Sequence, residues 1–126
     1  MSEQLLELEV LPLYAQVGVQ DADTTDLPDW QTGNERAVAT THAILVATRP
    51  DTEGKVVIRV IPGSADAGTI VFDGALDVTS GLIEVGNAIA GTVERVVLRN
   101  PGVHRVQIAV DAIEAPAVIT VAIEGA

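Results

Sequence analysis

Three carboxylates within six residues form a candidate set of metal ligands. They lie in the run Asp21–Asp26, and carboxylate oxygens are ligands that Ca²⁺ prefers. A hand-type calcium loop also requires glycine at its sixth position and a bidentate acid at its twelfth. Counted from Asp21, those positions hold Asp26 and Thr32, so we predict a solvated acidic loop and no metal. An enzyme or a metal-dependent carbohydrate binder stays as an alternative that rests on this loop alone.

The side chains that usually carry catalysis are scarce and poorly spaced. The chain has no cysteine, and neither His42 nor His104 has a His or Glu partner four residues away. We expect His104, at the start of a strand, to face solvent. No serine occurs in a Gly-x-Ser-x-Gly elbow, and no glycine-rich loop leads into a helix to hold phosphate. We therefore predict that the chain is not an enzyme and holds no cofactor.

Aromatic side chains are almost absent, so the few present stand out. The chain has one tryptophan, Trp30, in the sequence Pro28-Asp29-Trp30-Gln31, and one tyrosine, Tyr14. Trp30 either fills one open end of a core poor in aromatics or anchors an interface, where tryptophan is over-represented. The same two interpretations apply to Tyr14, and its hydroxyl needs a hydrogen-bond partner if it is buried.

The negative charge is concentrated in one part of the chain. Residues 1–35 contain eight acids and no Lys or Arg, a sum of −8, whereas residues 36–126 contain ten acids and seven bases, a sum of −3. Such a surface repels nucleic acid phosphates and attracts a basic protein. The alternative is that the charge serves solubility alone.

The compartment is predicted from what the sequence lacks. The absence of cysteine is compatible with a reducing cytosol. The start at residues 1–4 has neither the basic residues nor the apolar run of a secretory signal, and charge, Gly or Pro interrupts every apolar run. We predict a cytoplasmic protein with no membrane association.

The elements that must position these residues are predicted to be strands. Val, Ile and Thr make up 40 of the 126 residues, and β-branched side chains suit a pleated sheet. We predict one domain over 1–126, an all-β two-layer antiparallel β-sandwich of jelly-roll or Greek-key type, with a closed barrel as the alternative. Residues 20–37 are predicted to be irregular. About eight strands are expected, over 5–19 (with a bulge or a break at Pro12), 43–48, 55–61, 69–78, 82–85, 92–98, 103–110 and 117–124.

Three short motifs resemble those of a known family. Tyr14-Ala15-Gln16-Val17 is similar to a Tyr-x-Gln-Phe element, Pro28-Asp29-Trp30 to a following Pro…Trp element, and Gly102–Val106 to a Gly-x-Tyr-x-Leu element. Together they resemble the competence protein J family, small acidic β-rich bacterial proteins of which one member inhibits a DNA-entry nuclease. The chain departs from the family pattern at Val17, Val38 and Val103, where the family has aromatic residues. The resemblance implies a protein whose acidic face occludes the basic groove of a nuclease.

The predicted function is therefore that of an acidic protein-binding module. Its partner would be a basic protein such as a nuclease, and direct nucleic acid binding is not expected. The alternative is a structural or self-assembling β-sandwich subunit, because 48% hydrophobic residues leave room for a homo-oligomer interface. The predicted binding residues act by charge and by aromatic contact: Asp21, Asp23, Asp26, Asp29, Trp30, Glu35 and Tyr14.

Overall fold

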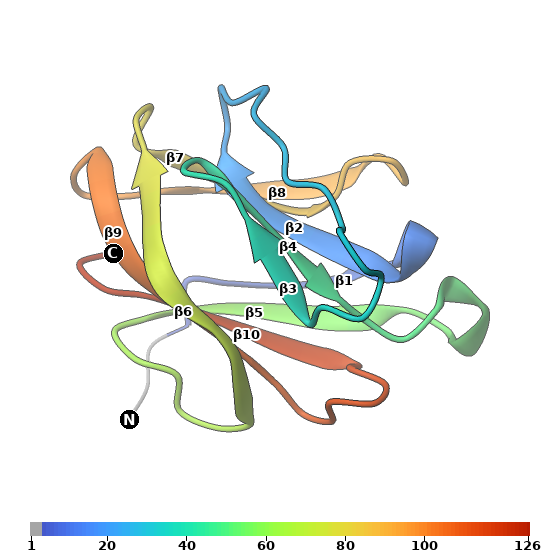
Figure 1. The fold of residues 1–126 in the computed structure, drawn as a ribbon. Helices are drawn as coiled ribbons and strands as arrows, with labels where there is room; N and C mark the ends of the chain where they lie inside the picture. The colour runs from blue at the N-terminus through green and yellow to red at the C-terminus, as the bar shows by residue number, and fades with distance from the viewer. Residues whose placement is uncertain (1–3) are drawn as a thin grey trace.

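A computed structural model describes residues 4–126 of the chain (Figure 1). The all-β prediction is confirmed, and no helix in the described range is long and apolar enough to cross a membrane. Two short 3₁₀ helices are η1 (Leu13–Ala15) and η2 (Asp51–Glu53). The strands are β1 (Leu6–Val10), β2 (Gln16–Asp21), β3 (Ala37–Ala39), β4 (Ala43–Ala47), β5 (Val56–Pro62), β6 (Thr69–Val78), β7 (Leu82–Asn87), β8 (Thr92–Val97), β9 (Gly102–Val110) and β10 (Val118–Ile123).

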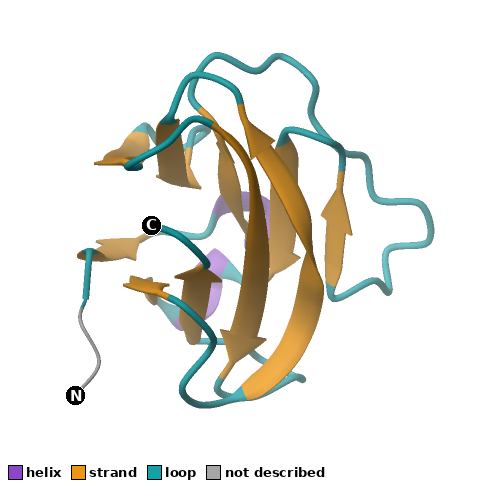
Figure 2. Cartoon of the chain, turned by 90° about the vertical axis from the view of Figure 1, so that its left-hand side faces the viewer, coloured by secondary structure: helices purple, strands orange, loops and turns teal. Residues whose placement is uncertain are grey.

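The strands form two layers (Figures 1 and 2). Sheet A has the order β1-β5-β10-β9-β6, and sheet B has the order β3-β4-β2-β7-β8. The predicted sandwich is confirmed. Each sheet keeps two open edges within the described residues, so the barrel alternative is wrong.

One pair of strands departs from the antiparallel expectation. β5 and β10 are parallel, with Val57 opposite Val118 and Val60 opposite Val121. Alternation along a strand determines which side chains face the core, but it carries no information about the direction of the neighbouring strand. The sequence pattern therefore could not predict this pairing.

The number of strands also differs from the prediction. Of the bulge or break predicted at Pro12, the structure has a break, and β1 and β2 on its two sides belong to different sheets. β3 was not predicted, because its three residues are too few to show an alternating pattern. These two differences account for ten strands in place of about eight.

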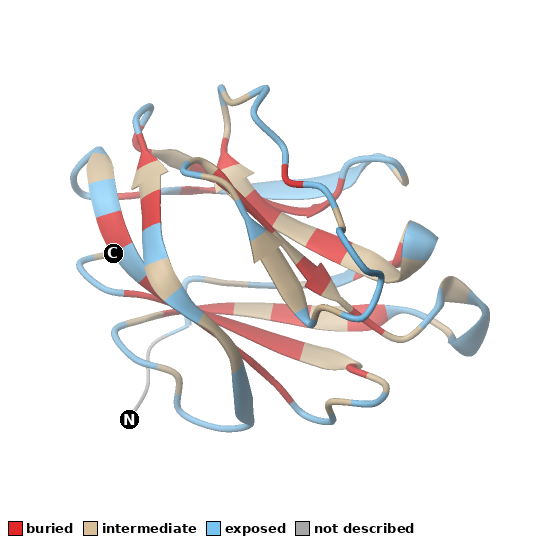
Figure 3. Cartoon of the chain, viewed as in Figure 1, coloured by how far each residue is buried: buried red, intermediate tan, exposed pale blue. Residues whose placement is uncertain are grey.

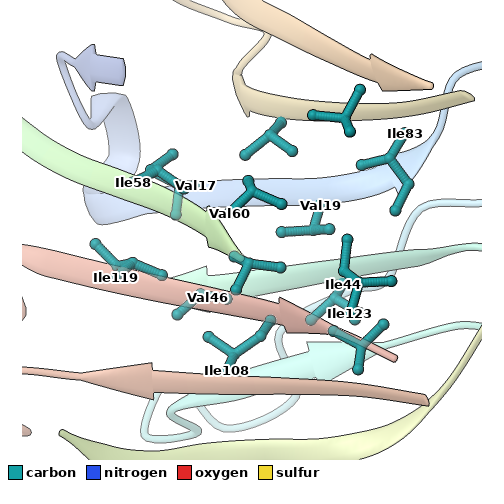
Figure 4. Packing of buried hydrophobic residues seen from close by; sticks show 14 of the residues in the cluster. Val17, Val19, Ile44, Val46, Ile58, Val60, Ile83, Ile108, Ile119 and Ile123 are labelled. Carbon is teal, nitrogen blue, oxygen red and sulfur yellow. The ribbon is translucent and has the colours of Figure 1, made fainter. Parts of the chain in front are cut away.

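The core lies between the sheets and is aliphatic, as predicted. Buried residues alternate along β2 and most of β5, which gives the banded pattern along these strands in Figure 3, whereas five successive residues of β10 are buried. Side chains from both layers meet in Figure 4, with burial of each Val, Ile or Leu stabilising the fold by about 1.5–3 kcal/mol. The labelled members are Val17, Val19, Ile44, Val46, Ile58, Val60, Ile83, Ile108, Ile119 and Ile123.

His104 belongs to this inner face, so the expectation that it faces solvent is wrong. It is 8% exposed, and its ring nitrogens lie 2.9 Å from the carbonyl oxygen of Glu124 and 2.8 Å from that of Asn100. The physical reason is the period of β9, since His104 precedes the buried Val106 and Ile108 by even numbers of residues.

Candidate protein-binding surface

The irregular segment 22–36 positions most of the predicted binding residues. It leaves the end of β2 and runs back over the outer face of sheet B before β3 begins (Figure 1). Backbone hydrogen bonds at Ala22 and Arg36 fix its two ends, and two side-chain hydrogen bonds hold its middle. Thr40 Oγ1 donates to the carbonyl oxygen of Asp26 at 2.9 Å, and Trp30 Nε1 donates to Gln16 Oε1 at 2.8 Å. Trp30 therefore lies against the outside of the sheet and does not close an end of the sandwich.

Asp21 ends β2 and is 3% exposed. Its carboxylate accepts hydrogen bonds from the Ser80 backbone N–H at 3.2 Å and from the Ser80 hydroxyl. Ser80 lies in the turn between β6 and β7, so this contact ties the end of β2 to that turn. Asp21 is thus a buried residue that stabilises the backbone of the β6–β7 turn, and its carboxylate is not free to contact a partner.

Asp23 and Asp26 are exposed beside Asp21 at this end of sheet B. The three acids line one hollow, together with His42 and the β6–β7 turn. His42 Nδ1 lies 2.9 Å from the carbonyl oxygen of Asp77, which holds the ring against the hollow. Within residues 4–126, no group of three or more His, Cys, Asp or Glu side chains is placed to hold a metal.

Glu35 orders the far end of the segment. Its carboxylate accepts a hydrogen bond from the Thr32 hydroxyl at 2.7 Å, and it accepts further bonds from the backbone N–H groups of Gln31, at 2.6 Å, Thr32 and Asn34. These bonds, the Thr32 hydroxyl first, lower the pKa of Glu35 to about 2. The charge of Glu35 is thus used to close the turn over residues 31–35.

A groove lies between this segment and the outer face of sheet B. Its volume is about 320 Å³, and Leu27, Pro28 and Trp30 form one wall. Ile89 and Val93 lie on the side of β8 and are 58% and 37% exposed, which is high for large apolar side chains. The groove thus combines apolar walls with Asp29 at its rim.

Two paired glycines form the floor of the groove. Gly18 of β2 lies opposite Gly86 of β7. A Cβ atom at Gly18 would meet its nearest neighbour, Leu45 Cδ2, at 3.5 Å, whereas one at Gly86 would lie 2.2 Å from the carbonyl oxygen of Thr92. This groove was not predicted from the sequence, although a glycine between two inward valines in a strand is itself a signal of close approach.

Tyr14 lies at the opposite end of β2 from the acidic hollow. It belongs to η1, has a positive φ of 61° and is 78% exposed. η1 precedes β2, which spans about 17 Å at 3.3 Å per residue, and Trp30 binds Gln16 at this same end of the strand. Its exposed hydroxyl does not need a protein partner.

The acids of the irregular segment are not neutralised by the protein's own bases. The four ion pairs among the described residues use Glu114, Asp66, Glu84 and Asp73, all of which follow residue 35. The carboxylates of Asp23, Asp26 and Asp29 accept none of the side-chain hydrogen bonds found within residues 4–126. Asp23, Asp26 and Asp29 therefore keep unpaired negative charges beside sheet B, whereas the exposed Glu7 and Glu9 lie on β1 of sheet A.

The comparisons with known proteins identify the fold. No family model matches the chain, and no curated protein matches it. Among solved structures, it is similar to ComJ from Bacillus subtilis, an inhibitor of the DNA-degrading activity of NucA. The similarity has a TM-score of 0.72 at 16% sequence identity and covers 100% of this chain and 99% of ComJ. The chain therefore has the fold of ComJ, and its predicted resemblance to the competence protein J family is confirmed at the level of the fold.

Proposed function

We propose that this chain is an acidic protein-binding module that inhibits a basic partner such as a nuclease. The observation that carries the proposal is the full-length similarity to a nuclease inhibitor. The region of unpaired carboxylates supports it independently, because a nuclease that binds DNA presents a basic groove. The module acts by binding rather than by catalysis, in the cytoplasm and without a cofactor.

The acidic hollow provides the long-range attraction. Asp23 and Asp26 are exposed and lack cationic partners among the described residues, so their field extends outward until salt screens it over about 8–10 Å. Such a field raises the rate of association with a basic surface and disfavours neutral or acidic partners. Asp21 and Glu35 hold the backbone that carries these charges.

Trp30 and the groove provide the short-range contact. The ring is fixed by its bond to Gln16, so little side-chain entropy is lost when a partner covers it. A standard interface covers roughly 800 Å² on each partner. Such a contact would cover about one eighth of the accessible surface of the chain, which is 6353 Å².

The test compares two pairs of acid-to-amide substitutions with the same change in charge. Asp23→Asn with Asp26→Asn removes two charges from the hollow, and Glu7→Gln with Glu9→Gln removes two exposed charges from β1. The protein is used to capture basic proteins from the cytosol of its own cells at low salt. Inhibition of nuclease activity and association rates are then measured on the captured partner.

We expect the hollow pair to slow association by about 3–10-fold and the β1 pair to have a smaller effect. The difference should shrink as salt is added. Recovery of no basic protein at low salt would contradict the proposal. Equal effects of the two pairs would contradict the location of the binding surface.

A second candidate function is self-assembly through the edge strand β8. Val97 on this strand is 80% exposed, and an edge with exposed apolar side chains can pair with the same edge of another copy. Light scattering across a range of concentrations tests this candidate. A monomer at every concentration argues against it, whereas a dimer lost in Val97→Lys supports it.

A further inference from the structure

We infer that the groove over Gly18 and Gly86 receives one long basic side chain, arginine or lysine, from the protein partner. This inference rests on the proposed function and names the contact that segment 22–36 makes. Its basis is the combination of apolar walls, a backbone floor and an unpaired carboxylate at the rim.

The shape of the groove suits an unbranched side chain. Because neither floor residue has a side chain, an inserted chain can lie directly on the paired backbones of β2 and β7. Trp30 and Leu27 on one side and Ile89 and Val93 on the other provide apolar contacts for its methylene groups. The volume of about 320 Å³ is at the small end of the range for ligand pockets, so it suits a side chain better than a larger molecule.

The charges determine which end of the side chain lies where. Glu84 and Asp29 are the only charged residues among the fifteen described residues that line the groove. Glu84 already binds Arg95, whose Nη2 lies 3.0 Å from Glu84 Oε2, whereas the Asp29 carboxylate has no such partner in the described chain. A cationic head group would therefore lie toward Asp29 and away from Arg95.

A cation is favoured over a purely apolar anchor. An apolar side chain would remove water from the Asp29 rim without replacing the lost hydrogen bonds, which is unfavourable. A guanidinium or ammonium group replaces them, and it gains further if it approaches the face of Trp30. The long stem of either residue covers the apolar walls at the same time.

The first experiment needs no partner, because Trp30 is the single tryptophan and provides one indole N–H signal. Isotope-labelled protein is titrated, at constant ionic strength, with the N-acetyl amides of arginine and lysine. The N-acetyl amides of citrulline and norleucine are the neutral controls. We expect the signals of the Trp30 indole and of the Gly18 and Gly86 amides to shift with the basic probes only.

Two variants and one control locate the response. Gly18→Val fills the floor; its Cβ would meet no atom closer than 3.5 Å, and β-branched side chains suit strands. Asp29→Asn removes the rim charge, and Glu9→Gln removes one exposed charge from β1. We expect loss of the arginine response in Gly18→Val, weakening by about 3–10-fold in Asp29→Asn, and less than twofold change in Glu9→Gln.

The outcomes separate this inference from the proposed function. Equal responses to arginine and citrulline, or an unchanged response in both groove variants, would overturn the inference. A stronger response to norleucine would replace it with an apolar anchor. Capture of a basic partner that both groove variants bind as well as the natural chain would leave the proposed function standing and refute the groove contact.

Discussion

Substitution by alanine should lower the stability of the fold strongly at one of the two glycines at the floor of the groove and little at the other. Gly86 has a φ of +141°, which an L side chain rarely adopts, and an added Cβ would lie 2.2 Å from the Thr92 carbonyl oxygen. Gly18 lies opposite it, but a Cβ there makes only ordinary contacts. We therefore predict that Gly86→Ala is strongly destabilising and that Gly18→Ala is not.

The magnitude follows from two contributions. The unfavourable backbone conformation costs about 1–2 kcal/mol, and forcing the β7–β8 backbones apart costs about 1–3 kcal/mol. Gly86→Ala should then lower the free energy of unfolding by about 2–5 kcal/mol, which corresponds to a fall in Tm of about 6–25 °C for a chain of this size. Gly18→Ala should change it by less than about 1 kcal/mol, because alanine also reduces the freedom of the unfolded chain.

Urea unfolding followed by circular dichroism measures both free energies under the same conditions, and thermal melts provide a second measure. Gly18→Ala serves as the matched control, since the two variants add the same methyl group to paired positions. A loss of less than 1 kcal/mol in Gly86→Ala would refute the close contact between β7 and β8. Equal losses in the two variants would refute the assignment of the groove floor to Gly18.

Three further predictions concern the residues that support the surface. Since the pKa of Glu35 is lowered to about 2, its carboxylate stabilises the turn above the ordinary pKa of 4.5, and this contribution is lost as pH falls toward 2; the Gln31 and Thr32 amide signals should follow that titration, and Glu35→Gln should abolish it. Ser80→Ala should cost about 1–3 kcal/mol in urea unfolding, because it leaves the buried Asp21 carboxylate short of a donor; a neutral result would contradict that bond. Trp30→Phe keeps an aromatic ring but loses the bond to Gln16, so hydrogen exchange should quicken across 22–36 while sheet A stays unchanged; equal protection in both proteins would contradict the anchoring role.

The sequence predicted the position of a strand and its buried face well where the pattern within that one strand determines them. Val106, Ile108 and Val110 alternate with polar residues, and β9 lies where that pattern predicts it. The same period assigns His104 to the inner face, so the pattern indicated its burial even though we expected it to face solvent.

Features that join distant parts of the chain could not be predicted in this way. Asp21 and Ser80 are 59 positions apart, and only the folded structure shows that they meet. The groove likewise combines a loop, two glycines from separate strands and the start of β8. Tyr14 and Trp30, grouped in the prediction by their chemistry, differ in their surroundings: Tyr14 in η1 is 78% exposed, whereas Trp30 is half-buried and bonded to Gln16.

The place of β10 has a consequence for how the protein is made. β10 is the tenth strand along the described chain, yet it lies in the middle of sheet A, between β5 and β9. While the ribosome is still translating residue 118, β5 lacks one neighbour and the inner face of sheet A is incomplete. Pairings between such distant segments also form slowly. The newly made chain therefore exposes apolar strands until β10 has left the ribosome and paired with β5 and β9, and the high density of acids in its first 35 residues can limit aggregation during that interval.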